Sequence, residues 1–149
     1  MAKLRLLITI LTVAPVWKMF YNGIMGTELI LNDASECYTP LNTIWYEAWL
    51  RVDGIIVSYA KIWDKPVYNG KLCVCTIETR EGHRRQGHSK TILHLIEAQL
   101  GKPVCTNADF TPEGFLALSK RPVLDGYEPA TGPRVDSMNF VSDWDSMRK

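Results

Sequence analysis

The stretch from Leu72 to Leu100 constrains the fold of this chain more than any other part of its sequence. Leu72 to Thr79 is apolar at nearly every position, which is typical of a strand in the centre of a sheet. Ser89 to Leu100 carries apolar residues at helical spacing and is followed by Gly101, so we expect an amphipathic helix that ends there. A short basic loop, residues 80–88, joins the two. This order predicts a sheet with a helix packed on it.

The rest of the chain supplies further strands and helices to the same sheet. Thr43 to Arg51 alternates apolar and polar residues, Asp53-Gly54 favours a tight hairpin turn, and Ile55 to Trp63 is expected as the returning strand. The other expected elements are a first strand at Lys3 to Val13, a helical region at Val16 to Met25, a loop at Asn32 to Pro40, a turn at 64–70, a short strand at Pro103 to Thr106, a helix from the N-cap Thr111 to about Lys120, and two last strands near Leu124 to Glu128 and Val135 to Val141. Together they predict an α/β (α+β) fold, a mixed sheet flanked by helices, in a single domain of residues 1–149.

The N-terminal apolar run and the cysteines bear on the compartment. Lys3 and Arg5 precede the run Leu6 to Val16, as in a signal peptide, but the run is rich in β-branched residues, too short to span a bilayer and followed by no convincing cleavage site. We therefore expect a strand and a cytoplasmic protein without membrane contact. The four cysteines lack zinc-ligand spacing, so we expect them reduced and mostly buried, and we expect no metal: Cys37, Cys73, Cys75 and Cys105.

The net charge of the chain bears on which class of partner it binds. The chain has 17 Lys and Arg residues and 16 Asp and Glu residues, a formal net charge of +1. A nearly neutral chain without a basic stripe argues against a nucleic-acid partner. Any electrostatic site must therefore be local, and the basic loop 80–88 is the place where positive charge gathers.

The junction of this loop with the following helix has the chemistry of an anion site. The first amides of a helix have no helical acceptor and lie at the positive end of the helix dipole. Gly87 allows a ligand to approach the backbone closely, and Arg80, Arg84, Arg85 and Lys90 surround it. Two familiar phosphate loops are excluded, because the chain has neither the P-loop pattern nor the dinucleotide G-x-G-x-x-G pattern. We therefore expect this junction to bind a pyrophosphate.

The six residues Arg84-Arg85-Gln86-Gly87-His88-Ser89 resemble the Q/R-x-x-G-x-G/A signature of the GNAT superfamily of N-acetyltransferases. As in that family, the signature follows a strand and opens a long helix, and Asn107, a further helix and the Gly126-Tyr127 pair come after it. The resemblance covers about Ile55 to Val141. It implies a GNAT-like acyl-CoA N-acyltransferase fold, with the mixed sheet splayed between the fourth strand, Leu72 to Thr79, and the fifth, Pro103 to Thr106.

The resemblance also implies which residues hold the cofactor, acetyl-CoA. Backbone amides from 85 to 90 would bind its pyrophosphate, and the backbone of Ile77 and Thr79 would pair with the pantetheine arm. Asn107 matches the Asn after the fifth strand that often contacts the cofactor. The implied cofactor-binding residues are Ile77, Thr79, Arg84, Arg85, Gln86, Gly87, His88, Ser89, Lys90 and Asn107.

Two positions depart from the family pattern. Ser89 replaces the usual Gly or Ala, yet it is small and its hydroxyl can donate one bond. The helix after the fifth strand, residues 114–120, lacks the Tyr that often protonates the leaving thiolate. The sequence therefore assigns no general acid.

The candidate for the catalytic base is Glu78, which precedes the end of the fourth strand, where the acetyl group would lie. The alternative is that Glu78 is a solvated carboxylate at a strand end, and Glu47 is a weaker candidate for the base. Acyl transfer through Cys75 is disfavoured, because no His lies beside it to activate the thiol.

The resemblance implies an N-acetyltransferase in which a primary amine attacks acetyl-CoA directly. The amine acceptor, a small molecule or a protein, is not identified by the sequence, and a homodimer is left open. A GNAT-fold module that binds acyl-CoA without turnover is the alternative function. A nucleic-acid contact of the basic loop is a third, which the balanced charge disfavours.

Overall fold

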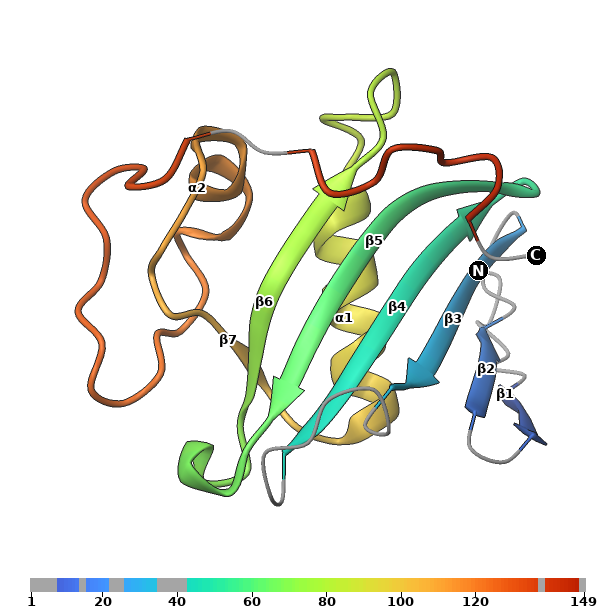
Figure 1. Ribbon diagram of the computed structural model, residues 1–149, viewed down its shortest axis with the longest axis horizontal. Coiled ribbons are helices and arrows are strands. Elements are labelled where there is room, and N and C mark those ends of the chain that lie inside the picture. The colour runs from blue at the N-terminus through green and yellow to red at the C-terminus, as the bar shows by residue number, and fades with distance from the viewer. Residues whose placement is uncertain (1–7, 14–15, 22–25, 35–42, 137–138, 148–149) are drawn as a thin grey trace, which may run out of the picture.

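The protein is an α+β fold built on a five-stranded mixed sheet, seen in a computed structural model that describes residues 8–13, 16–21, 26–34, 43–136 and 139–147 (Figure 1). The sheet order follows the chain, β3-β4-β5-β6-β7. Its first four strands are antiparallel neighbours, and β6 and β7 are parallel. The strands are β3 Thr27–Asp33, β4 Ile44–Val52, β5 Ile55–Asp64, β6 Leu72–Thr79 and β7 Val104–Cys105.

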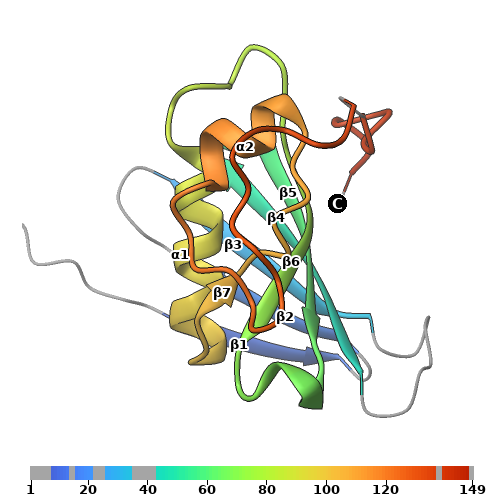
Figure 2. The same ribbon diagram turned by 90° about the vertical axis from the view of Figure 1, so that its left-hand side faces the viewer.

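The helix α1, His88–Leu100, covers one face of this sheet, and the C-terminal segment 139–147 crosses the other face (Figure 2). The core lies between α1 and the sheet, because the apolar stripe of α1 meets the inward residues of the strands. Its fully buried members include Ala48, Leu50, Ala60, Ile62, Leu72, Ile92, Leu93, Ile96 and Val104. None of the helices in the described part of the chain has the length and apolar character needed to cross a bilayer.

The elements expected in the middle of the chain are confirmed. Asp53 and Gly54 both have positive φ, 49° and 81°, so the hairpin between β4 and β5 has the backbone that its sequence predicts. The expected strand Leu72 to Thr79 is β6, and the expected helix is α1, ended by Gly101 with φ 67°. The shorter helix α2, Pro112–Leu118, begins after Thr111, whose hydroxyl accepts from the Gly114 amide at 3.0 Å.

The helix expected at Val16 to Met25 is wrong for the residues that the structure describes. Val16–Tyr21 is the strand β2, which pairs antiparallel with β1, Ile8–Val13, in a separate two-stranded sheet. Valine and aromatic residues favour strands, and a pairing partner was available in the neighbouring apolar run. The strand β3 was missed as well, and its last residues, Asn32 and Asp33, were expected in a loop.

The two last strands expected from the sequence are also wrong. Residues 124–128 form a turn in which the Tyr127 amide donates to the Leu124 carbonyl at 3.1 Å, with Gly126 at φ 90°. No strand occurs in the described parts of 135–141. Pro129 and Pro133 lack the N–H that a ladder requires, which disfavours strands here. The Gly126-Tyr127 pair therefore does not begin a strand.

Candidate functional site

The loop between β6 and α1 has an unusual backbone that its sequence permits. Gly82, Arg85 and Gly87 all have left-handed backbone, with φ of 86°, 62° and 82°. Glycine adopts such angles without strain, and Arg85 is the one non-glycine residue in the loop that does so. The loop projects beyond the end of β6 (Figure 1). Left-handed residues next to right-handed ones can turn successive amides toward a common side, an arrangement that favours anion binding.

The amides at the start of α1 are available to a ligand. The first helical bond is from the Thr91 amide to the Gly87 carbonyl, at 3.0 Å, and the Thr91 hydroxyl donates to the same oxygen. Between residues 85 and 90, no amide donates to a backbone carbonyl within the described ranges. The geometry expected for an anion site is therefore present.

A chain of hydroxyl groups ties this loop to the sheet. Thr79 Oγ1 lies 3.0 Å from Ser89 Oγ and 3.3 Å from Ser58 Oγ, and the Ser58 hydroxyl donates to the Glu78 carbonyl at 3.0 Å. Ser58 is fully buried. The three side chains join β5, the end of β6 and the first turn of α1, and thereby hold the amides of the first turn in place. The Ser89 hydroxyl, expected to face a phosphate, therefore has Thr79 as its partner.

The positive side chains near the loop differ in what they contact. Arg84 donates from Nε to the Thr79 carbonyl at 3.1 Å, which holds this exposed guanidinium close to the end of β6. Arg85 and Lys90 are exposed. Arg80 instead pairs with Asp145, at 2.9 Å from Nη2 to Oδ1. The charge offered at the helix start thus comes from Arg84, Arg85 and Lys90.

The two loop histidines lie near each other. The rings of His83 and His88 are 6.5 Å apart, centroid to centroid. Partial burial, and secondly the positive charge of His83, lower the pKa of His88. His88 is therefore biased toward the neutral imidazole. His94 is exposed on α1, as expected for a residue of the outer helix face.

The edge of β6 beside the loop is unpaired over most of its length. The pairs Leu72–Val104 and Cys73–Cys105 are the register of β6 with β7. Beyond them the chain leaves β6 and makes an isolated bridge from Thr106 to Val123. Ile77 and Thr79 pair with β5 on their other side. Residues 74–79 therefore present a strand edge with no partner among the residues that the structure describes.

Asn107 lies just after β7 and makes a local turn. Its Oδ1 accepts from the Asp109 amide at 3.1 Å, and Ala108 between them has φ 66°. The N-cap of α2 is Thr111, as expected. The side-chain oxygen of Asn107 thus shapes the backbone at the point where the chain leaves β7.

Glu78 is buried, with an exposed fraction of 9%, so the alternative of a solvated carboxylate is wrong. Its Oε2 accepts from the amides of Phe140 and Val141, both at 2.9 Å. These hydrogen bonds join β6 to the C-terminal segment, which crosses the end of β6 on the sheet face opposite α1 (Figure 1). No local signal in the sequence points to this contact, because the two partners are 62 and 63 residues away from Glu78 along the chain.

Glu47, the weaker candidate for the base, lies on the same sheet face. Its Oε2 accepts from the Tyr59 hydroxyl at 2.7 Å, and Tyr59 is the register partner of Glu78. Tyr59 thus stands between the two carboxylates on β4 and β6. The structure brings both candidates onto one face and gives each a hydrogen-bond donor.

The Glu78 contact leads to a stability prediction. Glu78→Ala leaves two amides, one of them on the buried Val141, without their charged acceptor, so we expect the free energy of unfolding to fall by about 1–3 kcal/mol. Urea denaturation measures the loss, and hydrogen exchange at Phe140 and Val141 should accelerate. Glu81→Ala, at an exposed carboxylate of the loop, is the matched control and should change little. Unchanged exchange at both amides in Glu78→Ala would contradict the assignment.

The described cysteines are free thiols, as expected. Cys73 and Cys105 are buried and Cys75 is exposed, while Cys37 lies outside the described residues. Burial raises the pKa of Cys73 to about 11, with a smaller contribution from Cys75, so Cys73 stays a thiol at neutral pH. Within the described ranges, no group of three or more His, Cys, Asp or Glu side chains is placed to hold a metal ion.

Comparison of the chain with protein-family models, with curated proteins and with solved structures finds no match in any of the three. The function therefore has to be argued from the loop, the strand edge and the carboxylates themselves.

Proposed function

We propose that this protein binds acetyl-CoA at the β6–α1 loop and transfers the acetyl group to a primary amine, on a GNAT-like fold. The observation that carries the proposal is the set of amides from 85 to 90 at the start of α1, which have no backbone acceptor among the described residues and lie beside Arg84, Arg85 and Lys90. A pyrophosphate needs several converging donors and positive charge, and this junction offers both.

The unpaired edge of β6 supports the same ligand. The pantetheine arm of CoA contains two amide groups, which can hydrogen-bond to a strand edge as an added strand does. Residues 74–79 offer such an edge, and it ends at Thr79, where the loop begins. A ligand with its pyrophosphate on the loop amides would thus have its arm beside Thr79 and Ile77.

The chemistry requires a neutral amine, an acceptor for its proton and a donor to the oxyanion. Glu78 faces away from α1 and has Oε2 engaged by the Phe140 and Val141 amides, which leaves Oε1 for proton transfer. No Tyr is present in α2 to protonate the thiolate. Positioning of the two reactants would supply much of the acceleration, about 7–11 kcal/mol in well-oriented cases.

The hydrogen bonds that Glu78 accepts favour a second candidate function, a module that binds acyl-CoA without turnover. Two amide donors occupy one oxygen of Glu78, and Glu47 is likewise bonded to Tyr59. Both candidates require CoA binding at the same loop, so the proposed cofactor site does not depend on the choice between them.

Two measurements test the proposal. Calorimetric titration with CoA should give saturable binding at one site per chain, and no binding would refute both candidates. Turnover is then followed by loss of thioester absorbance with a panel of primary amines. This readout is preferable to thiol reagents, because Cys75 is exposed and would react with them. Binding without amine-dependent turnover would favour the module.

A further inference from the structure

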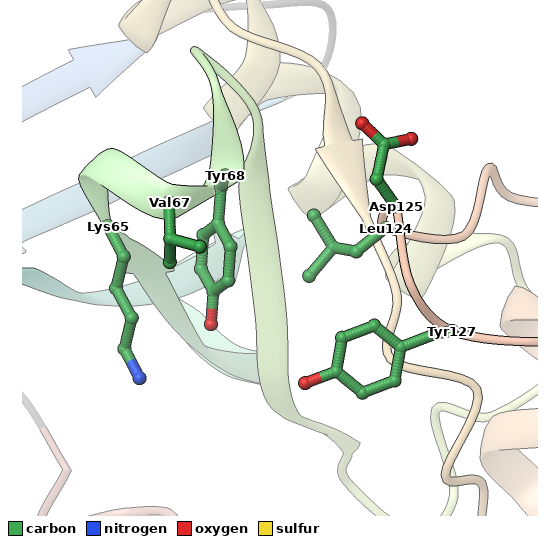
Figure 3. Close-up of a pocket in the computed structure, with 6 residues that line it drawn as sticks. All are labelled: Lys65, Val67, Tyr68, Leu124, Asp125 and Tyr127. Atoms are coloured by element: carbon green, nitrogen blue, oxygen red, sulfur yellow. The ribbon is translucent and has the colours of Figure 1, made fainter.

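A small cavity lies at the other end of β6 from the β6–α1 loop. It has a volume of about 190 Å³ and lies between the 3₁₀ turn η2, Pro66–Tyr68, and the turn at 124–127 (Figure 3). Leu72 begins β6 beside η2, whereas the loop leaves β6 at Thr79. The cavity is therefore separate from the proposed CoA site. Its lining residues are Lys65, Val67, Tyr68, Leu124, Asp125 and Tyr127.

Tight turns hold both walls of the cavity in place. The Tyr68 amide donates to the Lys65 carbonyl at 2.9 Å, and the Tyr127 amide donates to the Leu124 carbonyl at 3.1 Å. Leu124 is buried, packs with Cys73 and Cys105, and forms the apolar floor. The walls are thus preformed, which lowers the entropic cost of binding a ligand.

The outer walls are apolar yet open to solvent. Val67 is 73% exposed and Tyr127 is 50% exposed. Exposed large apolar side chains that flank a cavity mark a binding site more often than single scattered ones do. A flat apolar ligand placed between Tyr68 and Tyr127 would cover both.

The polar groups are divided between the two ends of the cavity. In Figure 3 the ammonium of Lys65 and the hydroxyls of Tyr68 and Tyr127 lie toward one end, and Asp125 lies at the other. Lys65 Nζ is 3.6 Å from the centroid of the Trp63 ring and 5.8 Å from that of Tyr68, so aromatic contacts hold its charge at this end.

These groups favour an anion. Burial, with a smaller contribution from Cys73, raises the pKa of Tyr68 to about 12, so its hydroxyl remains a donor at neutral pH. Asp125 lies 3.5 Å from Lys71 Nζ, and its charge is thereby offset. The charge at this end of the cavity is therefore the positive charge of Lys65, beside the hydroxyl of Tyr127 and that of Tyr68, which also hydrogen-bonds with Cys73.

The volume limits the size of the ligand. About 190 Å³ is below the usual range of about 300–1,000 Å³ for sites that take drug-sized molecules, so it suits a single ring and excludes a nucleotide. We propose that this cavity binds a monocyclic aromatic carboxylate, with the ring between Tyr68 and Tyr127 above Leu124 and the carboxylate at Lys65 and the two hydroxyls.

The test uses three probes of one shape and different charge: benzoate, benzamide and benzamidinium. We expect benzoate to bind with a dissociation constant on the order of 1 mM or tighter, and benzamidinium to bind much more weakly, because its charge repels Lys65. Amide chemical shifts followed by NMR during titration should change at residues 65–68 and 124–127, and not at 80–90. Tighter binding of benzamidinium, no saturable benzoate binding, or shifts confined to 80–90 would each overturn the proposal.

Single substitutions distinguish the contribution of the Lys65 charge from that of the aromatic side chains that line the cavity. Lys65→Met should weaken benzoate binding about tenfold, the change expected for one charge-assisted hydrogen bond, and leave benzamide nearly unchanged. Tyr127→Ala should weaken both probes, because it removes a wall. Lys120→Met, at an exposed Lys after α2, is the matched control and should bind benzoate like the parent chain. Equal benzoate affinity in Lys65→Met and the parent would also overturn the proposal. None of these readouts requires CoA, so failure here is distinguishable from failure of the proposed function.

Discussion

Gly87→Trp is expected to lower CoA affinity at least about 100-fold. Gly87 is the residue from which α1 begins, and a Cβ built on it meets no atom within 4 Å, so a side chain would project into open space at the helix start. In the proposed complex that space holds the pyrophosphate, and an indole would exclude it. The positive φ of 82° adds roughly 1–2 kcal/mol of strain to any residue with a side chain.

Gly70→Trp is the matched control for this experiment. Gly70 has nearly the same φ, 81°, and equally open surroundings, but it lies in the turn before β6, at the other end of the strand from the loop. The two variants carry the same strain and the same added side chain, so both should lose similar stability. Calorimetry should then show CoA binding in Gly70→Trp and none in Gly87→Trp. Equal affinities in the two variants would contradict the assignment of CoA to the helix start.

Ile96→Ala is expected to reduce the free energy of unfolding by about 2–5 kcal/mol. Ile96 is fully buried on the face of α1 that packs on the sheet, so removing its side chain leaves a cavity in the main core. For a chain of this size each kcal/mol corresponds to roughly 2–4 °C in Tm. Urea denaturation and thermal unfolding followed by circular dichroism measure both effects.

His94→Ala provides the control on the same helix. His94 is exposed, and its replacement leaves the helix packing intact, so we expect a change within about 0.5 kcal/mol. A similar loss in both variants would show that α1 is not packed as described. Because α1 also carries the loop amides at its N-terminus, Ile96→Ala should weaken CoA binding only through loss of folded protein.

The middle of the fold was predictable because its signals are local. A hairpin turn, a helix cap and an apolar stripe each depend on residues within a few positions of one another. The turn at Asp53-Gly54, the cap at Thr111 and the helix ended by Gly101 followed from such signals. The loop 80–87, with its left-handed Gly87, was found for the same reason.

The strand Val16–Tyr21 and the segment after α2 were mispredicted because their structure depends on pairing partners. Val16–Tyr21 has apolar residues at helical spacing, yet it pairs as a strand with Ile8–Val13. The residues from Leu124 to Glu128 were expected as a strand, yet their backbone bonds in a turn and to Thr106. Periodicity over six or seven residues does not separate these alternatives, and the available partner decides.

In the candidate site, too, some features depend on residues that are close in sequence and others on residues that are far apart. The sequence by itself determined the strand end, the glycine-containing loop and the helix start between residues 79 and 91, because these are local properties of the chain. Only the tertiary structure decided the state of Glu78, which the amides of Phe140 and Val141 bind from more than 60 residues away. The physical reason is that a buried amide outside a strand pair still requires a hydrogen-bond acceptor, and the tertiary fold decides which acceptor lies within reach. The backbone of the loop at Arg84 to Ser89 is thus set by its own residues, while Glu78 takes its hydrogen-bond partners from the far end of the chain.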